Sequence, residues 1–305
     1  MYQLKRILIG LDFSDMDAHI LKYVSLLANK IQPEVVYFFA VEKKLIIPAS
    51  LKEKYSGDHA PVDEILVKEL QSRAEAFFEK PESCIIKFEV KIGIPHRQIR
   101  EWSEIKEIDL IVMGRKVSMT GSSKLPNSIT RSSHCSVLIV PENPPLQIQR
   151  LLVPINADNK ENLPLLAALE LVTKADLKLL VQSIYEVPTG YHYSGKSFEE
   201  FSQIMEHNAQ VKMDAVKRRY KLEGQPIEYL FSFDDEHDLA EKIYETALKE
   251  NVDMILMGSK GRTKTASLVL SSIAEKVTVY DKIIPLLIVK NKAKNLGFLD
   301  ALKQL

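Results

Sequence analysis

The sequence has no excess of charge of either sign. Its 305 residues include 41 lysines and arginines and 41 aspartates and glutamates, so the formal net charge is zero. Proteins that bind nucleic acid through its phosphate backbone normally carry a basic excess. We therefore expect no nucleic-acid partner.

Cysteine is also scarce, and long apolar runs are missing near the start of the chain. The two cysteines, Cys84 and Cys135, form no CxxC pair and cannot build a disulfide framework. We interpret them as reduced thiols. The first apolar run, residues 7–11, is followed at once by Asp12 and is too short for a signal peptide or a membrane span. We expect a cytoplasmic protein with no membrane partner.

The common catalytic motifs are missing too. The histidines show no HxxxH or HExxH spacing, and neither GxSxG, a kinase signature set nor GxxxxGK[ST] occurs. No residue is placed in the sequence as a general base. We predict a protein without catalytic residues and without a zinc site, and leave slow hydrolysis of a bound nucleotide open.

An internal repeat is present. The segment RILI at residues 6–9 resembles RLLV at 150–153, and IDLIVMG at 108–114 resembles VDMILMG at 252–258. Both pairs are 144 residues apart, because 150 − 6 and 252 − 108 give the same difference. We predict one domain over residues 1–141, a second over 149–291, a proline-rich linker between them, and a C-terminal tail over 292–305 that could form a short docking helix.

Each half alternates apolar strands with helical patterns, which is typical of an α/β fold. Continuous apolar strands joined by helices indicate a parallel sheet that is buried on both faces. We predict two Rossmann-like domains, each with five parallel strands in the order 3-2-1-4-5 and helices on both faces. The expected strands are residues 7–11, 35–41, 85–92, 110–113 and 137–140, then 151–155, 177–184, 227–231, 254–257 and 286–289.

One capping box is predicted in each half, directly after the first strand. Ser14 with Asp17, and Asp158 with Glu161, have the spacing at which each side chain satisfies an amide of the first helical turn.

In a parallel sheet of this order, ligands bind beyond the carboxyl ends of the first and fourth strands.

The loop after the fourth strand of the second half has the character of a phosphate site. Gly258 and Gly261 are three residues apart and let the backbone turn and approach a ligand closely. Ser271 and Ser272 open the next helix, whose first amides favour an anion. The alternative is a plain glycine turn with solvated basic side chains, Lys260, Arg262 and Lys264.

These motifs resemble the universal stress protein family, as a tandem, two-domain member. The segment MGSKGRTKTASLVLSSIAEKV is similar to the nucleotide loop G-x2-G-x9-G-[ST] of that family, and GIPHRQI and EIDLIVMG are equally typical. The resemblance runs from about residue 4 to 290. It implies ATP at the crevice between the first and fourth strands in many members. It also implies pairing of domains through their last strands, here residues 137–140 against 286–289, as an intramolecular pseudo-dimer; a homodimer of two chains stays open.

Carried over by position, the resemblance points mainly to the second half. Gly258 and Gly261 stand at the glycine positions, Ser271 replaces the third glycine, and Ser272 keeps the hydroxyl. The first-strand aspartate becomes Asn156, which can still accept and donate hydrogen bonds. The complete set of residues expected to bind nucleotide there is Asn156, Ile184, Gly258, Ser259, Gly261, Arg262, Ser271 and Ser272.

The first half keeps only part of the motif. It retains Asp12, Gly114 and Ser128, but Val117 and Asn127 fill the other two glycine positions. A β-branched valine resists the positive φ that a glycine turn can need, and it would crowd a phosphate. We expect the first half to bind nucleotide weakly or not at all.

An acidic segment, residues 233–238, stands in the second half where the first half has Gly-Ile-Pro. Its carboxylates and His237 could hold a divalent metal such as Mg²⁺ beside phosphates. The favoured interpretation is an acidic helix start that complements the helix dipole.

Three functions follow as hypotheses. The first is an ATP-binding regulator or sensor in the stress response, acting on an unknown protein partner. The alternative is a nucleotide-free scaffold that works through protein–protein interaction. An enzyme of the ATP pyrophosphatase class would need an SGGxDS-type loop after its first strand, and none is present.

Overall fold

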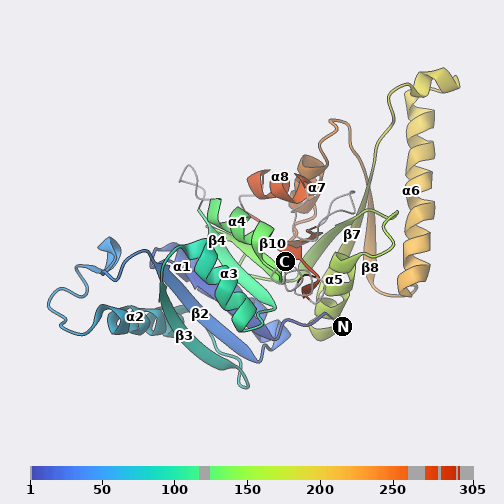
Figure 1. The fold of residues 1–305 in the computed structure, drawn as a ribbon. Coiled ribbons are helices and arrows are strands. Elements are labelled where there is room, and N and C mark those ends of the chain that lie inside the picture. The colour runs from blue at the N-terminus through green and yellow to red at the C-terminus, as the bar shows by residue number, and fades with distance from the viewer. Residues whose placement is uncertain (1, 117–123, 260–271, 281–282, 293–294, 296–305) are drawn as a thin grey trace, which may run out of the picture.

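The computed structural model describes residues 2–116, 124–259, 272–280, 283–292 and 295, and Figure 1 shows their arrangement. The first half alternates strands and helices. Its strands are β1 (Arg6–Leu11), β2 (Val35–Glu42), β3 (Ile85–Ile92), β4 (Leu110–Arg115) and β5 (Ser136–Pro141). Its helices are α1 (Met16–Ile31), the short η1 (Ala49–Leu51), α2 (Val62–Phe77), α3 (Pro95–Ile105) and α4 (Lys124–Ser132).

The second half repeats this succession. Its strands are β6 (Arg150–Ile155), β7 (Lys178–Tyr185), β8 (Ile227–Phe233), β9 (Met254–Gly258) and β10 (Leu286–Val289). Its helices are α5 (Leu163–Lys174), the short η2 (Tyr191–Ser194), α6 (Phe198–Tyr220), α7 (Leu239–Lys249) and α8 (Ser272–Tyr280).

All ten strands join in one sheet. Its order is β3-β2-β1-β4-β5-β10-β9-β6-β7-β8, so the order of the first half recurs in the second half in mirror direction. Neighbouring strands are parallel except at the centre, where β5 and β10 pair antiparallel with Leu138 opposite Leu287. The α/β fold class is confirmed, and the halves join through their last strands.

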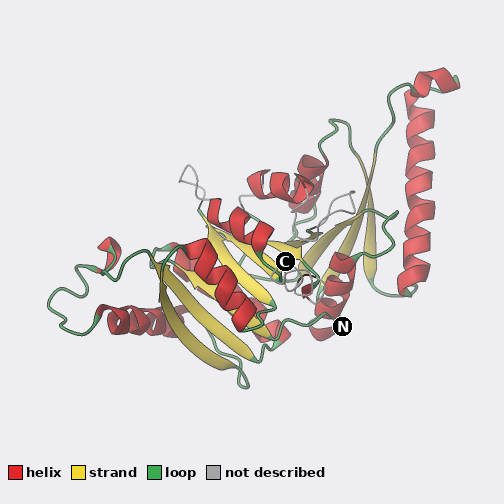
Figure 2. Ribbon diagram, viewed as in Figure 1, coloured by secondary structure: helices red, strands yellow, loops and turns green. Residues whose placement is uncertain are grey.

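Helices cover both faces of the sheet (Figure 2). One core cluster runs across both halves and includes Ile20 of α1, Leu66 of α2, Leu165 of α5 and Met213 of α6. Two separate clusters form the other face, one under α3 and α4 and one under α7 and α8. Because apolar side chains point to both faces of the central strands, these strands read as continuous hydrophobic runs in the sequence.

Contacts beyond the strand pairing also hold the halves together. The hydroxyl of Tyr23 on α1 donates to the carbonyl of Asp253 at 3.3 Å. The ammonium of Lys290, just after β10, is buried and donates to the carbonyl of Ser133 at 2.7 Å. Burial lowers the pKa of Lys290 to about 8. Polar groups of one half are thus satisfied by the other, as buried polar groups require.

Both predicted capping boxes are wrong. Helix α1 begins at Met16, one residue before Asp17, and α5 begins at Leu163, beyond Glu161; neither has a side-chain cap. The Asp17 carboxylate instead accepts from the amide of Asp12 and from Arg73. Asp158 pairs with Lys212 of α6 at 2.9 Å. Long-range partners therefore outcompete the local cap in both loops.

Two further findings concern the predicted C-terminal tail and the length of the helices. The predicted tail helix falls almost entirely outside the described residues. Among the helices that are described, none combines the length and the apolar composition that a membrane span needs.

Candidate functional site

The carboxyl ends of the first and fourth strands lie side by side in each half. Strand β1 pairs with β4 in the first half, and β6 pairs with β9 in the second. Here the strand order reverses, which is where parallel α/β sheets bind ligands. The two halves present different side chains at this position.

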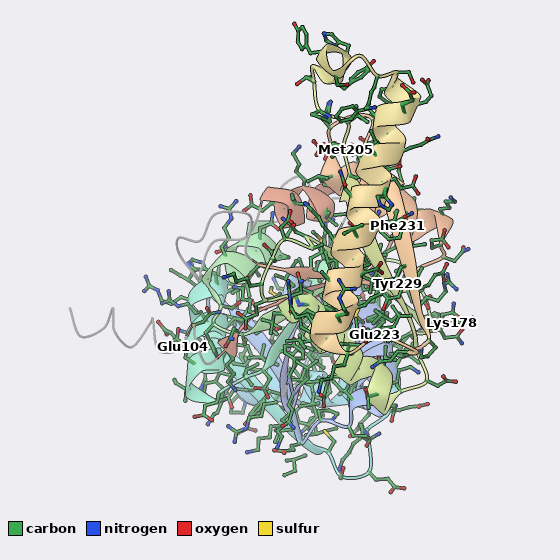
Figure 3. The ribbon with its side chains drawn as sticks, turned by 90° about the vertical axis from the view of Figure 1, so that its right-hand side faces the viewer. Glu104, Lys178, Met205, Glu223, Tyr229 and Phe231 are labelled. Carbon is green, nitrogen blue, oxygen red and sulfur yellow. The ribbon has the colours of Figure 1, made fainter. Side chains whose placement is uncertain are left out.

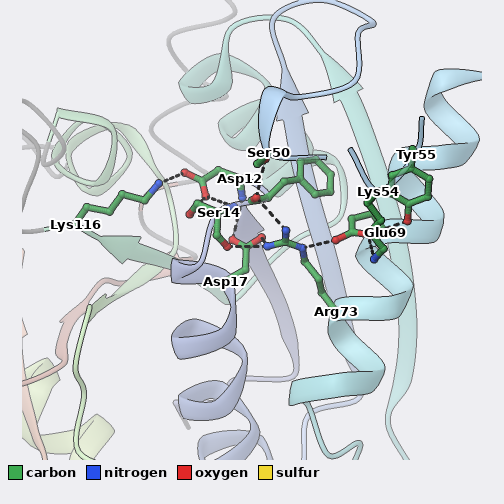
Figure 4. A network of polar contacts seen from close by, with 10 residues as sticks. Asp12, Ser14, Asp17, Ser50, Lys54, Tyr55, Glu69, Arg73 and Lys116 are labelled. Atoms are coloured by element: carbon green, nitrogen blue, oxygen red, sulfur yellow. Dashed lines mark hydrogen bonds and ion pairs between the residues drawn. The ribbon is translucent and has the colours of Figure 1, made fainter. Parts of the chain in front are cut away.

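In the first half an ion pair joins the two strand ends. The Asp12 carboxylate, after β1, accepts from the ammonium of Lys116, after β4, at 2.7 Å (Figure 4). It also accepts from the amide and hydroxyl of Ser14. Burial raises the pKa of Asp12, but the hydrogen bonds from Lys116 and Ser14 outweigh this and hold it below its usual value. The carboxylate that would contact a nucleoside is thus already engaged with the protein.

An arginine from α2 fixes the turn between β1 and α1. Arg73 donates to the carbonyls of Phe13 and Ser14 at 3.0 and 2.7 Å, and pairs with Asp17 at 2.9 Å and Glu69 at 2.8 Å (Figure 4). Phe13 has a φ of 60°, an uncommon conformation for a bulky residue, and is held there by these bonds. The first-half loop is therefore clamped in one conformation.

Neither Arg73 nor Lys116 was among the residues predicted from sequence. Arg73 lies 56 positions after Asp17, so no local spacing connects them. Lys116 has a sequence signal, because Lys260 stands 144 residues later in the second copy of the motif. Asp17 is buried, which raises its pKa to about 6 despite the neighbouring arginine.

Gly114 is packed closely against α1. A Cβ placed there would lie 2.7 Å from Cδ1 of Ile20 and 2.7 Å from Cγ of Met16. These distances are shorter than van der Waals contact, so a methyl group there would force the side chains of Met16 and Ile20 to shift, and the glycine favours close helix–strand packing. Close packing of β4 against α1 is therefore an alternative reason for a glycine at position 114, beside the predicted approach to a ligand.

Gly258, the equivalent glycine of the second half, is less crowded by the residues that the structure describes. Of these, a Cβ there would meet Pro164 alone, at 3.4 Å from Cγ and 3.8 Å from Cδ, which is ordinary contact. The difference arises because α5 begins at Leu163, after a loop of residues 156–162, whereas α1 begins after residues 12–15 alone. Pro164, in the first turn of α5, lies over Gly258, whereas Met16 and Ile20 of α1 both crowd Gly114.

Asn156 follows β6 at the position of Asp12. Its Oδ1 accepts from the amide of Asp158 at 3.0 Å, a local turn that holds the side chain at the strand end. An asparagine carries no charge, so it cannot form the ion pair seen in the first half. The second half therefore has no equivalent of the Asp12–Lys116 ion pair at Asn156, and the side-chain amide of Asn156 can still donate a hydrogen bond.

The structure describes three more of the predicted second-half positions. Ser259 is buried and its amide donates to the carbonyl of Val289 at 3.3 Å. Ile184 is half-buried near the end of β7 and packs against the core beneath α7 and α8. Ser272 is the first described residue of α8. Gly261, Arg262 and Ser271 lie outside the described residues.

Ser128 occupies a different place from the one predicted. It was aligned with Ser272 at an offset of 144, but α4 begins at Lys124, so Ser128 lies in its second turn. The described parts of the two helices are offset by 148, because 272 − 124 gives that difference, and the residues before each, 117–123 and 260–271, lie outside the described part of the chain. The predicted glycine-position residue Val117 lies outside the described residues, and Asn127 lies within α4.

The acidic segment before α7 forms a helix start. Asp238 is the N-cap residue, and its carboxylate accepts from the amides of Ala240 at 3.1 Å and Glu241 at 3.4 Å. Asp235 pairs with Lys242 at 2.9 Å. In the part of the chain that the structure describes, no group of three or more histidine, cysteine, aspartate or glutamate side chains is arranged to hold a metal. The Asp238 cap confirms the predicted acidic helix start.

Comparison with known proteins decides the family. A model of the universal stress protein family matches residues 3–141 and again residues 147–290. The chain belongs to the universal stress protein family. Its two halves are tandem domains of that family, as the motifs predicted.

Relatives of this universal stress protein have diverged in sequence. A universal stress protein of Methanocaldococcus jannaschii is 28% identical over 145 residues, which are 45% of this chain and 81% of the relative. The crystal structure of a functionally unknown protein from Pseudomonas aeruginosa PAO1 superposes with a TM-score of 0.66 at 15% identity, covering 99% of this chain and 98% of its own. A universal stress protein from Archaeoglobus fulgidus gives 0.62 at 17% identity, with 95% and 97% covered. The shared feature is the fold of both domains together.

Proposed function

We propose that this universal stress protein binds an adenine nucleotide, ATP, in its second domain and acts as a regulator or sensor in the stress response. The first domain then serves as the structural partner that completes the sheet. The residues proposed to hold the nucleotide are those predicted from sequence: Asn156, Ile184, Gly258, Ser259, Gly261, Arg262, Ser271 and Ser272.

One observation carries this proposal: the two equivalent strand ends differ in how far the protein fills them. In the first domain the Asp12–Lys116 pair bridges the ends, and Met16 and Ile20 cover Gly114. In the second domain the described neighbours of Gly258 leave room for a methyl group, with Pro164 at 3.4 Å, and the described part of α8 begins at Ser272. A glycine that the protein's own packing does not require is one that a ligand can require.

The residues would act by binding rather than by catalysis. The phosphates of ATP supply the negative charge that main-chain amides at a glycine loop and at the start of α8 favour. Asn156 would hydrogen-bond the nucleoside through its side-chain amide. Mg²⁺, where present, would be held by the phosphates, since the described residues form no metal cluster of their own. A bound nucleotide would then bias the loop conformation that a protein partner meets.

The first experiment is direct. The purified protein is denatured, and the supernatant is analysed for adenine nucleotide; the folded protein is then titrated with ATP. We expect released nucleotide or a measurable ATP affinity, and a loss of at least about tenfold in affinity for Gly258→Ala, because the added methyl blocks the backbone approach.

The control is Gly114→Ala, which places the same methyl at the equivalent position of the first domain. Its ATP affinity should equal that of the wild type. If the wild-type protein releases no nucleotide and ATP neither binds nor stabilises it, the proposal is wrong, and the nucleotide-free scaffold becomes the better hypothesis.

A further inference from the structure

Helix α6 forms the outer surface of the second domain. Figure 3 shows it in front of the sheet, and no other described element lies outside it. Its inner face packs through Ala209, Met213 and Val216, which are buried. Its outer face carries two apolar side chains, Ile204 at 38% exposure and Val211 at 52%.

The exposed apolar residues share one line along the helix. Ile204 and Val211 are seven residues apart, which brings them to nearly the same side after two turns. Ile204 lies five residues before buried Ala209, or about 140° away around the helix. A heptad-spaced apolar pair opposite the buried face is the pattern of a second packing surface.

The charges on α6 are divided between its ends. The first turn is acidic, with Glu199 and Glu200, and the last turn is basic, with Lys217, Arg218 and Arg219. Two such helices side by side in parallel would bring like charges together at both ends. Placed antiparallel, each acidic end meets a basic end.

The last strand of each domain, through which such sheets are expected to pair, is already paired within this chain. Strands β5 and β10 pair with each other inside the chain, so neither offers a free edge to another molecule. A dimer of this chain therefore needs a different face.

We infer that α6 is a self-association surface, and that a second copy of this chain packs on it antiparallel about a two-fold axis between His207 and Asn208. In this register Ile204 of one copy faces Val211 of the other, and the same contact repeats by symmetry. Glu200 then lies opposite Ala215 of the second copy, about 4.5 Å along the axis from its Arg218. The helix is therefore self-complementary in both apolar and charged positions.

The contact is small. A single pair of helices buries less than about 1,200 Å², the range of transient interfaces. We therefore expect a monomer–dimer equilibrium that depends on concentration, to be followed by sedimentation equilibrium over roughly 1 µM to 1 mM.

A charge-swap series tests both the surface and the orientation. Ile204→Glu and Val211→Lys should each weaken dimerisation at least about tenfold, because each places a charge against an apolar side chain. The double variant should recover wild-type affinity to within about threefold, since glutamate and lysine then face each other twice. Both positions are exposed, so circular dichroism should show every variant folded.

A cysteine pair gives an independent readout. The native cysteines are buried, so Asn208→Cys introduces the one accessible thiol among the described positions. Beside the two-fold axis it should form an interchain disulfide under oxidation, whereas Gln210→Cys, on the flank of the helix, should not. A monomer at every concentration, a double variant no better than the single ones, or equal crosslinking at both positions would each overturn the inference. So would dimerisation that Ile204→Glu leaves unchanged.

Discussion

Two glycines at equivalent strand ends differ in what surrounds them. Gly114→Ala places a methyl 2.7 Å from atoms of Met16 and Ile20, so we expect it to destabilise the protein by about 1–3 kcal/mol. Among the described residues, Gly258→Ala meets Pro164 alone at contact distance, and its stability should stay within about 1 kcal/mol of the wild type. Urea unfolding midpoints of the two variants measure this directly. Equal losses would show that both glycines serve packing alone.

A buried histidine makes stability depend on pH. Burial lowers the pKa of His134 to about 4, below its unfolded value near 6.5; Glu104 opposes the shift, and Lys292 and Lys290 add to it. The unfolded chain therefore binds more protons between these values, and stability rises with pH from about 4 to 6.5. Acidification through this window should remove up to about 3 kcal/mol.

The variant His134→Leu isolates this contribution. It keeps a side chain of similar size, and its stability should depend less on pH between 4 and 6.5 than that of the wild type. Other groups that titrate in this range, such as Asp17 with its raised pKa, are the same in both proteins. Identical pH profiles would rule His134 out as the cause.

At the scale of single residues, the sequence predicted which residues stand at the strand ends better than it predicted the groups that surround them. The positions of Asp12, Gly114, Asn156 and Gly258 at strand ends followed from the apolar runs that precede them. The groups that hold the first-half strand end did not follow from the sequence, because Lys116, which binds Asp12, and Arg73, which binds Asp17, come from other elements. Ser128 lies within the described part of α4, whereas Ser272 is the first described residue of α8, and a fixed repeat offset hides such a difference.

Among the elements, α2 controls the loop between β1 and α1 through one side chain. Arg73 is 18% exposed and forms ion pairs with Asp17 and Glu69, which are nearly buried. Arg73→Met would leave two buried carboxylates without this partner, and removal of one member of a buried pair costs about 3–5 kcal/mol. Urea unfolding measures the loss, and Lys54→Met, which removes a mostly exposed partner of Glu69, is the milder control. Similar losses for the two variants would contradict the clamp.

Hydrophobic periodicity predicted the strands well, but it predicted the hydrogen bonds in the loops that follow them poorly. Every predicted strand is present: the central strands are apolar runs buried on both faces, and the edge strands β3 and β8 are more exposed but follow in the same alternation with helices. The capping boxes failed because the local hydrogen bonds compete with tertiary ones: Asp17 is taken by Arg73, and Asp158 by Lys212. Spacing within the chain carries no information on partners more than 50 residues away.

Across the whole molecule, the continuous sheet should couple the two domains. The single tryptophan, Trp102, lies on α3 of the first domain, whereas the proposed nucleotide site lies in the second. ATP at about 100 times its dissociation constant stabilises the folded state by about 2.7 kcal/mol, roughly 5 °C for a chain that unfolds as one unit. We expect tryptophan fluorescence and far-ultraviolet circular dichroism to show the same shift.

Two outcomes check this coupling. At the same ATP concentration, Gly258→Ala should reduce the ATP-induced shift to about half or less by both probes, because a tenfold loss of affinity leaves about 1.4 kcal/mol of stabilisation. A shift seen by circular dichroism alone, with the midpoint of Trp102 fluorescence unchanged, would mean that the domains unfold independently despite the β5–β10 pairing.

The central claim is that one domain of the pair binds nucleotide and the other does not, and calorimetric titration with ATP tests it most directly. The account predicts one ATP per chain, with the affinity lowered by Gly258→Ala and unchanged by Gly114→Ala. Two ATP molecules per chain, or an affinity that follows Gly114 rather than Gly258, would contradict it.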